Sequence, residues 1–370
     1  MYKIVQIVPA LGWGGAQVFC MQLCNQLAQY PGYNVTLISL YNYNAEKHLP
    51  LSMLDKKVKF ISLDKKPGID VSIFKKVYKV LKDIKPDVVH THLHAGYYCF
   101  FAYYKLKYPF KKIHTLHNLA KEDAPLHGRK LYKYCFKRDI IHPVTISEEV
   151  YKSAVAEYGS FIKTLINNGS NPVLPTNAFT SIKEKIHTLK KDASTKILLN
   201  VARITRQKNQ QLLIECMQKL QEKNVNAIAI VLGDYVPVDK NIYDELIAKK
   251  PANVHFLGKV SNVSDYLLQA DAFVLTSTFE GLPISLLEAL SAGAAPICTP
   301  VGGIKNIVTE DIGFLSADVS VNAYTKTLED YFNTNNTELN RIKQNGQRLY
   351  EQEFSMQSCA AKYDVLYHAP

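Results

Sequence analysis

Two glutamates with seven residues between them, Glu280 and Glu288, are the most suggestive residues of this chain. Glu280 follows an apolar run, and the turn Gly281-Leu282-Pro283 separates it from a leucine-rich stretch of helical periodicity that contains Glu288. The pattern predicts a buried strand, a loop with Glu280, and a helix with Glu288 near its first turns. Carboxylates at the carboxyl end of a strand suit a hydroxyl-rich ligand, because each can accept two hydrogen bonds. The same spacing also fits a loop acid and a helix-dipole acid that bind nothing.

A basic segment, residues 203–209, follows another apolar run. Its Arg203 and Lys208 come directly after a predicted strand and could reach a diphosphate, whose negative charge they would neutralise. Solvated surface charge is the other interpretation of these two side chains.

A glycine-rich loop, Gly12-Trp13-Gly14-Gly15-Ala16-Gln17, lies between the first predicted strand and the first predicted helix. Glycines at this position let the backbone approach a diphosphate at the helix N-terminus. The G-x-G-x-x-G spacing of dinucleotide-binding proteins is absent, and a tight turn without a ligand stays open as an alternative.

Histidines gather on two successive predicted strands. We expect His90, His92 and His94 to lie on one side of an extended strand end, with His117 at the end of the next strand. Residues two apart on a strand are separated by roughly 6–7 Å, which makes convergence of three imidazoles on a metal ion awkward. His117 fits either a cleft histidine with a catalytic part or an ordinary strand-end residue.

Strand and helix patterns alternate throughout the 370 residues, which predicts an α/β protein with parallel sheets. The turn-rich segment 167–172 has no periodicity and divides the chain. We therefore predict two doubly wound, Rossmann-like domains over residues 1–170 and 171–355 that face each other across a cleft, with a last helix in 356–370 packing back on the first domain. The clearest predicted strands are 3–8, 34–40, 88–92, 112–117, 140–145, 196–201, 227–232, 254–257, 272–275, 295–298 and 313–315.

The composition is that of a soluble globular protein, with 47% hydrophobic and 21% charged residues. No apolar run reaches 18 residues, and the N-terminus lacks a signal-peptide pattern. Seven cysteines scattered through apolar segments predict reduced thiols and a cytoplasmic location.

Positive charge is concentrated in the N-terminal half. Residues 1–170 contain 24 Lys and Arg against 12 Asp and Glu, whereas the remaining residues contain 20 against 21. This asymmetry predicts an anionic partner for the first half. Basic and aromatic residues alternate in 97–112 and 129–138, which suits peripheral binding to the anionic inner face of a cell membrane, although core helices with snorkelling lysines fit as well. No nucleic-acid-binding module accompanies the charge, so nucleic acid is not expected as a partner.

No D-x-D or H-E-x-x-H motif occurs, so no metal cofactor is expected.

Taken in order, these residues resemble glycosyltransferase family 4, the retaining nucleotide-sugar enzymes with the GT-B fold. The resemblance covers nearly the whole chain, and the paired glutamates around Gly-Leu-Pro are its most specific part. It implies an N-terminal acceptor-binding domain and a C-terminal donor-binding domain. It also implies that His117 and Glu280 act at the sugar, and that the donor is bound by Gly15, Arg203, Lys208, Gly258, Lys259, Val260, Gly281, Leu282, Pro283 and Glu288.

The resemblance implies transfer of a hexose or N-acetylhexosamine from a nucleotide-diphosphate sugar, with UDP-sugars favoured over GDP-sugars. The implied acceptor is a glycan or lipid-linked glycan in bacterial capsule, O-antigen or other surface polysaccharide synthesis, and no metal takes part. Ala202 and Asn209 replace glycines that are frequent in the family, which leaves donor identity open. A non-catalytic nucleotide-sugar or phospholipid-binding protein and a nucleotide-sugar epimerase are the alternatives.

Overall fold

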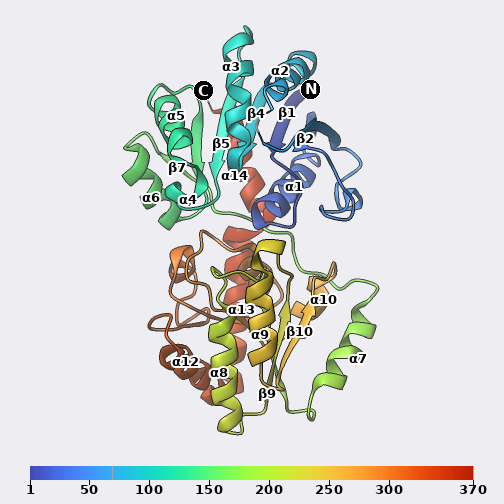
Figure 1. Cartoon of the computed structure of the whole chain (residues 1–370), viewed down its shortest axis with the longest axis vertical. Coiled ribbons are helices and arrows are strands. Elements are labelled where there is room, and N and C mark those ends of the chain that lie inside the picture. The colour runs from blue at the N-terminus through green and yellow to red at the C-terminus, as the bar shows by residue number, and fades with distance from the viewer. Residues whose placement is uncertain (69, 370) are drawn as a thin grey trace. The chain divides into compact units, whose positions relative to one another are not determined.

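The computed structural model describes residues 1–68 and 70–369, which form two compact units. The first contains the described residues up to 170 together with 354–369, and the second contains residues 171–353. Each unit is built on its own parallel sheet with helices on both faces (Figure 1).

The N-terminal unit contains a seven-stranded parallel sheet in the order β3-β2-β1-β4-β5-β6-β7. The order reverses at β1, as in doubly wound folds, and places the ends of β1, β4 and β5 next to one another. The strands are β1 (Tyr2–Val8), β2 (Tyr33–Tyr41), β3 (Lys59–Lys65), β4 (Val88–His92), β5 (Lys111–Leu116), β6 (His142–Thr145) and β7 (Thr164–Leu165). The helices are α1 (Gly15–Leu27), α2 (Ser72–Ile84), α3 (Phe100–Lys105), α4 (Ala120–Asp123), α5 (Leu126–Lys137) and α6 (Glu148–Tyr158).

Two strands of this sheet, β3 and β7, lie outside the strands predicted from the sequence. Both are at the edges of the sheet, where one side has no strand partner. β3 mixes exposed, half-buried and buried side chains, contains the polar Ser62 and Asp64 and carries a lysine at each end, and β7 is only two residues long. Neither has the continuous apolar run that reveals a central parallel strand.

The C-terminal unit contains a six-stranded parallel sheet in the order β10-β9-β8-β11-β12-β13. Its strands are β8 (Lys196–Val201), β9 (Ala227–Leu232), β10 (Val254–Gly258), β11 (Ala272–Leu275), β12 (Ala295–Cys298) and β13 (Phe314–Leu315). Its helices are α7 (Phe179–Leu189), α8 (Gln210–Glu222), α9 (Lys240–Lys249), α10 (Val263–Leu267), α11 (Ile284–Ser291), α12 (Val321–Asn333) and α13 (Asn336–Leu349). All six strands match segments that the sequence predicts.

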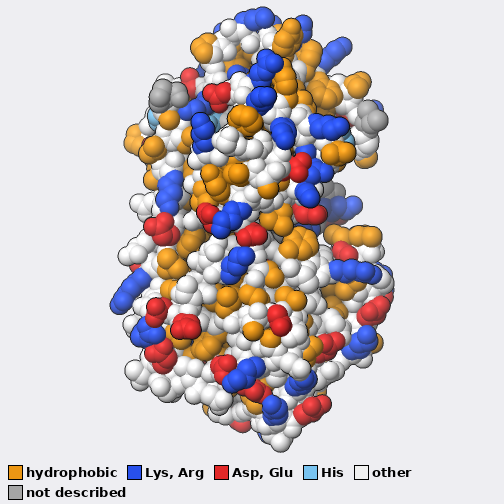
Figure 2. Space-filling model, turned by 90° about the vertical axis from the view of Figure 1, so that its left-hand side faces the viewer, with side chains coloured by type: hydrophobic (Ala, Val, Ile, Leu, Met, Phe, Trp, Pro, Cys, Tyr) orange, Lys and Arg blue, Asp and Glu red, His pale blue; other side chains and the backbone are white. Residues whose placement is uncertain are grey.

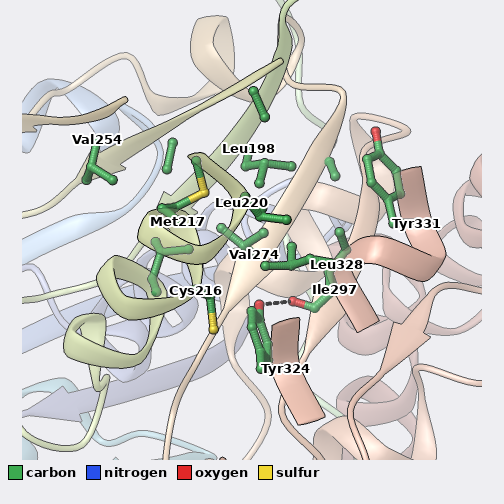
Figure 3. Close-up of a cluster of buried hydrophobic side chains, with 14 of the residues drawn as sticks. Leu198, Cys216, Met217, Leu220, Val254, Val274, Ile297, Tyr324, Leu328 and Tyr331 are labelled. Atoms are coloured by element: carbon green, nitrogen blue, oxygen red, sulfur yellow. Dashed lines mark hydrogen bonds between the residues drawn. The ribbon is translucent and has the colours of Figure 1, made fainter. Parts of the chain in front are cut away.

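The core of the C-terminal unit lies between the sheet and helices α8 and α12 (Figure 3). Leu198, Val274 and Ile297 from three neighbouring strands pack against Met217 of α8 and Leu328 of α12. The buried Tyr324 hydroxyl donates to the Ile297 carbonyl at 2.7 Å, so this polar group is satisfied inside the apolar layer. The core thereby fixes the strand ends from which the site loops emerge.

The last helix, α14 (Met356–His368), belongs to the N-terminal unit. The chain returns to this unit at Ser355, which bridges Ser170, and the Met356 amide donates to the Ser170 carbonyl at 2.8 Å. α14 then packs on α1, and its buried Tyr363 and Tyr367 approach the sheet.

All seven cysteines are buried and unpaired, as the sequence predicts. Burial raises the pKa of the Cys216 thiol to about 11 and that of Cys359 to about 12, so these thiols are inert packing groups. In the part of the chain that the structure describes, no helix combines the length and apolarity needed to cross a bilayer.

Candidate functional site

Three loops of the C-terminal unit meet because their parent strands are neighbours. β8, β11 and β12 lie side by side and run parallel, so their carboxyl ends share one edge of the sheet. The loop after β8 carries Arg203 and Lys208, and the loop after β11 carries Glu280. The loop after β12 begins the turn Gly302–Asn306. This edge is where parallel α/β sheets bind ligands.

Glu280 lies at the centre of this edge and is only 5% exposed. Its Oε1 accepts a 2.5 Å hydrogen bond from Lys208 Nζ and another of 2.5 Å from Ser277 Oγ. Its second carboxylate oxygen has no hydrogen-bond partner among the described residues. The ion pair holds the carboxylate in one orientation with one oxygen left to accept from a ligand.

The β8 and β11 loops are also joined by their backbones. The Thr278 amide donates to the Gln207 carbonyl at 2.8 Å, and Gln207 Nε2 donates to the Phe279 carbonyl at 2.9 Å. Thr276 Oγ1 donates to the Lys208 carbonyl at 3.1 Å. Lys208 is therefore fixed by main-chain contacts as well as by its ion pair.

Glycines of the third loop pack directly against the Glu280 segment. Gly302 has φ of +53°, and a Cβ there would lie 1.7 Å from the Glu280 carbonyl oxygen. The Gly303 amide donates to the Gly281 carbonyl at 2.9 Å. Only glycine allows both this left-handed conformation and this approach.

Helix α11 begins after Pro283, one residue earlier than the sequence predicts, and contains Glu288 in its second turn. Glu288 is half-buried, and its carboxylate makes no hydrogen bond or ion pair with the described residues. Burial raises the pKa of Glu288 to about 7. A partly desolvated acid without a partner among the described residues costs folding free energy, as expected of a group that binds a ligand.

The other predicted donor-binding residues of this unit lie at the same edge without contacting Glu280. The exposed Arg203 guanidinium makes no hydrogen bond or ion pair with the described residues. Gly258 ends β10 with φ of +72°, and its carbonyl accepts from the Gly233 amide at 2.9 Å; Lys259 and Val260 follow it. Asn209, which replaces a family glycine, has φ of +49°, a conformation that asparagine tolerates better than most residues.

In the N-terminal unit, Gly15 is exposed at the start of α1. No side chain caps this helix, and the Gln17 side chain folds back over Gly14, where a Cβ would meet its Oε1 at 2.4 Å. The open end of a 13-residue helix leaves backbone N–H groups that can attract an anion.

His117 follows β5 and is held at both its backbone and its ring. The His117 amide donates to Asp123 Oδ1 at 3.0 Å, and its Nε2 lies 2.8 Å from His92 Nδ1. Its Nδ1 is buried without a hydrogen-bond partner, and burial lowers the pKa of His117 to about 4. The imidazole is therefore neutral and has one nitrogen available.

The expectation that three histidines share one side of the β4 end is wrong for His94. The extended strand ends at His92, and Leu93 has φ of +52° at the start of a 3₁₀ turn, so the chain changes direction. The rings of His90 and His92 are tilted with centroids 4.3 Å apart, whereas His94 is exposed near Tyr41. Among the described residues, no group of three His, Cys, Asp or Glu side chains could hold a metal ion.

The structure thus brings Lys208 and Glu280 into contact and places Gly281 on Gly303, while Arg203, Glu288 and Gly258 approach the same edge separately. Sequence reasoning missed Ser277, the second partner of Glu280, and considered His92 only as a metal ligand, without foreseeing that it pairs with His117. The only signal for Ser277 was its place among the small polar residues that end the β11 run.

Two family models match the chain in succession. The model described as Glycosyltransferase Family 4 matches residues 13–171, and that described as Glycosyl transferases group 1 matches residues 181–349. An uncharacterized glycosyltransferase of Methanocaldococcus jannaschii is 30% identical over 245 residues, which are 61% of this chain and 59% of that protein. The UDP-Gal:alpha-D-GlcNAc-diphosphoundecaprenol alpha-1,3-galactosyltransferase of Escherichia coli is 26% identical over 69% of each chain.

The fold is also that of solved glycosyltransferase structures. Anabaena HepE, crystallised in complex with UDP and glucose, superposes with a TM-score of 0.81 over the full length of both chains at 16% identity. Two parallel Rossmann-like sheets of seven and six strands are the architecture of the GT-B fold. With both family models matched in order and this fold, the chain belongs to glycosyltransferase family 4 and is a GT-B glycosyltransferase.

Proposed function

We propose that this glycosyltransferase is a metal-independent, retaining enzyme that transfers a hexose or N-acetylhexosamine from a UDP-sugar. The acceptor we propose is a lipid-linked glycan in the synthesis of a bacterial surface polysaccharide. The Lys208–Glu280 ion pair carries the proposal, because it combines a cation for a diphosphate with a carboxylate for sugar hydroxyls at one strand edge.

The proposed donor site uses each group for one part of the nucleotide sugar. Arg203 and Lys208 neutralise the diphosphate, and Gly15 approaches it with its backbone amide. Glu280 and the backbone of Gly281–Pro283 hold the sugar, which His117 also contacts. Glu288 accepts from the ribose hydroxyls, and residues 258–260 line the base.

In the proposed reaction, the bond from the anomeric carbon to the diphosphate oxygen breaks, and a bond to an acceptor hydroxyl oxygen forms on the same face. The acceptor proton passes to the leaving diphosphate. The positive charges of Arg203 and Lys208 favour this departure, because they act on charge that grows in the transition state. No side chain forms a covalent intermediate in this scheme.

The choice of UDP and of a lipid-linked acceptor is supported by the relatives. HepE is named with bound UDP and glucose, and the E. coli relative is named for UDP-Gal and a diphosphoundecaprenol-linked sugar. We propose that the N-terminal domain binds the acceptor and the C-terminal domain binds the donor.

A panel of UDP-, GDP- and ADP-sugars, incubated with and without EDTA, tests this function. We expect slow sugar release from one UDP-sugar at a rate that EDTA leaves unchanged, with the α-anomer as the first product detected by proton NMR. Release only in the presence of added divalent metal, or a β-anomer as first product, would contradict the metal-independent or the retaining part of the proposal.

We also propose that the N-terminal domain docks on an anionic membrane from the cytoplasmic side. Figure 2 shows lysine and arginine side chains beside hydrophobic ones on one face of this unit. Tyr104 on α3 is 78% exposed, with the Lys105 and Lys107 ammonium groups 5.8 and 6.0 Å from its ring centre. On α5, Tyr134 is exposed and Arg138 lies 5.2 Å from its ring. Exposed aromatic rings paired with cations suit the headgroup region of an anionic bilayer.

Vesicle flotation tests the membrane proposal. The protein is expected to float with vesicles containing anionic phospholipid at low salt and to remain unbound with zwitterionic vesicles. The Tyr104→Ala/Tyr134→Ala variant should bind more weakly, because it loses the interfacial aromatic rings but none of the charge. Equal binding of both proteins would mean that the aromatic rings take no part in docking.

A further inference from the structure

A chain of buried hydrogen bonds leads from the start of the N-terminal sheet to His117. Gln6 on β1 has its Oε1 2.8 Å from His92 Nε2, and His92 Nδ1 lies 2.8 Å from His117 Nε2. Gln6 Nε2 donates to Tyr367 Oη on α14 at 2.8 Å, and His90 Nδ1 lies 2.8 Å from the same oxygen. Gln6, His90 and His92 are fully buried, so water does not compete for these bonds.

The bonding chain fixes which nitrogen of each ring carries the proton. A carbonyl oxygen only accepts, so His92 Nε2 must donate to Gln6 Oε1. Burial lowers the pKa of His92 well below its ordinary value, so the ring is neutral and its Nδ1 can only accept. His117 Nε2 must then donate to His92, which leaves the lone pair of His117 on Nδ1.

Burial lowers the pKa of His117 as well, to about 4, so Nδ1 stays unprotonated at neutral pH. This nitrogen is the one without a partner in the described residues. A buried lone pair of this kind is complementary to a hydrogen-bond donor, and a hydroxyl group supplies one.

We propose that Gln6, acting through His92, holds His117 in the Nε2–H tautomer so that its Nδ1 accepts a hydrogen bond from a hydroxyl of the donor sugar. The inference rests on the proposed function, in which His117 contacts the sugar. Gln6 and His92 are positioning residues, since neither touches the substrate. The recognised group must be able to donate, so a sugar with fluorine in place of that hydroxyl loses the contact.

Two substitutions at Gln6 separate the tautomer from simple packing. Gln6→Glu keeps an acceptor for His92 Nε2 and therefore keeps the direction of the chain as long as His92 stays neutral, which the nitrogen shifts of His92 report. Gln6→Met has a similar volume and length but offers no acceptor, so the two histidine rings are released from a single tautomer. Both variants lose the amide N–H that donates to Tyr367 Oη. A difference between the two variants therefore cannot come from the loss of that hydrogen bond.

The first experiment needs no substrate. Nitrogen chemical shifts of the ¹⁵N-histidine-labelled full-length protein, with His117 assigned from a His117→Asn variant, report which ring nitrogen is protonated. We expect His117 to be the Nε2–H tautomer in the wild type and in Gln6→Glu, and a mixture in Gln6→Met. A wild-type His117 protonated on Nδ1 would mean that the Gln6 amide points the other way, and the proposal would be wrong.

The second experiment uses the UDP-sugar that the enzyme hydrolyses and its monodeoxyfluoro analogues. One analogue should lose on the order of 10²-fold in kcat/KM with the wild type and with Gln6→Glu, but only a few-fold with Gln6→Met. With the normal sugar, Gln6→Met should lose about tenfold in kcat/KM and Gln6→Glu much less.

The outcomes distinguish the inference from the function on which it rests. The predicted tautomers without turnover of any nucleotide sugar would leave the tautomer assignment standing and contradict the proposed function. Turnover with equal losses in Gln6→Glu and Gln6→Met, together with equal falls in melting temperature, would assign Gln6 a packing role and overturn the inference.

Discussion

Replacing Glu280 with glutamine should lower kcat/KM by about 10²–10³-fold while leaving the protein folded. The Glu280 carboxylate is the counter-ion of Lys208 and is nearly buried, so the neutral amide leaves the lysine charge uncompensated. It also puts an N–H₂ group where one carboxylate oxygen is available to accept from sugar hydroxyls. Steady-state kinetics with the donor and circular dichroism of the folded protein measure the two parts of this expectation.

Ser277→Ala is the matched control, because it removes one of the two hydrogen bonds to Glu280 Oε1 and no charge. We expect the kcat/KM of Ser277→Ala to fall by no more than about tenfold. Glu280→Gln and Lys208→Met each break the same ion pair. Their losses in kcat/KM, expressed as free energies, should therefore be far from additive in the double variant. If the two losses multiplied, Lys208 and Glu280 would act independently and the paired site would be wrong.

Glu288→Gln should weaken UDP binding by about 10–100-fold and at the same time stabilise the ligand-free protein at pH 8. Nucleotide affinity is measured by calorimetry and stability by urea unfolding. The two effects have opposite signs because the carboxylate is partly desolvated and has no partner among the described residues until, as proposed, the ribose hydroxyls bind. If Glu288 instead had a structural role, its replacement would lower the stability of the protein.

The pH dependence follows from the raised pKa of Glu288. An unfolded glutamate ionises near 4.5, whereas burial raises the pKa of Glu288 to about 7. The native state therefore loses stability relative to the unfolded state as the pH rises from about 4.5 to about 7. The increase in the free energy of unfolding caused by Glu288→Gln should be small at pH 5 and about 2 kcal/mol larger at pH 8.

Nucleotide binding by the wild type should become stronger as the pH rises, whereas the stability of the ligand-free protein falls. Binding needs the ionised carboxylate, so affinity for UDP should fall about tenfold between pH 8 and pH 6 and should lose this dependence in Glu288→Gln. Glu222, an exposed glutamate of α8 in the same domain, is the control. Its replacement with glutamine should change neither stability nor the pH profile of binding.

Much of the proposed donor site was predictable from the sequence, because its residues directly follow strands that the local pattern of apolar residues reveals. The segments 197–199, 272–275 and 295–298 are buried and apolar, as central parallel strands require, and each is followed within a few positions by the polar or glycine residues of the proposed site. Since parallel strands share one carboxyl edge, the placement of Arg203, Lys208 and Glu280 at that edge followed from the element order alone.

The edge strands and the histidine geometry were not predictable in this way. β3 lacks a continuous apolar run because lysines, Ser62 and Asp64 interrupt it, and β7 is only two residues long. The direction of His94 depends on Leu93, a branched residue that the tertiary structure holds at φ of +52° against its intrinsic preference. A periodicity argument assumes that the strand continues, and it cannot detect where the backbone turns.

The sequence by itself determined the family, the two α/β domains and the residue types of the site, because these depend on local periodicity and on motifs within a few residues. Only the tertiary structure decided that Lys208 pairs with Glu280, 72 positions away, that Ser277 shares that carboxylate, and that hydrogen bonds through His92 link Gln6 to His117. These long-range hydrogen bonds and this ion pair arise from the order of the strands in each sheet and from the packing of side chains on neighbouring strands and loops. Neither is written in the spacing of residues along the chain.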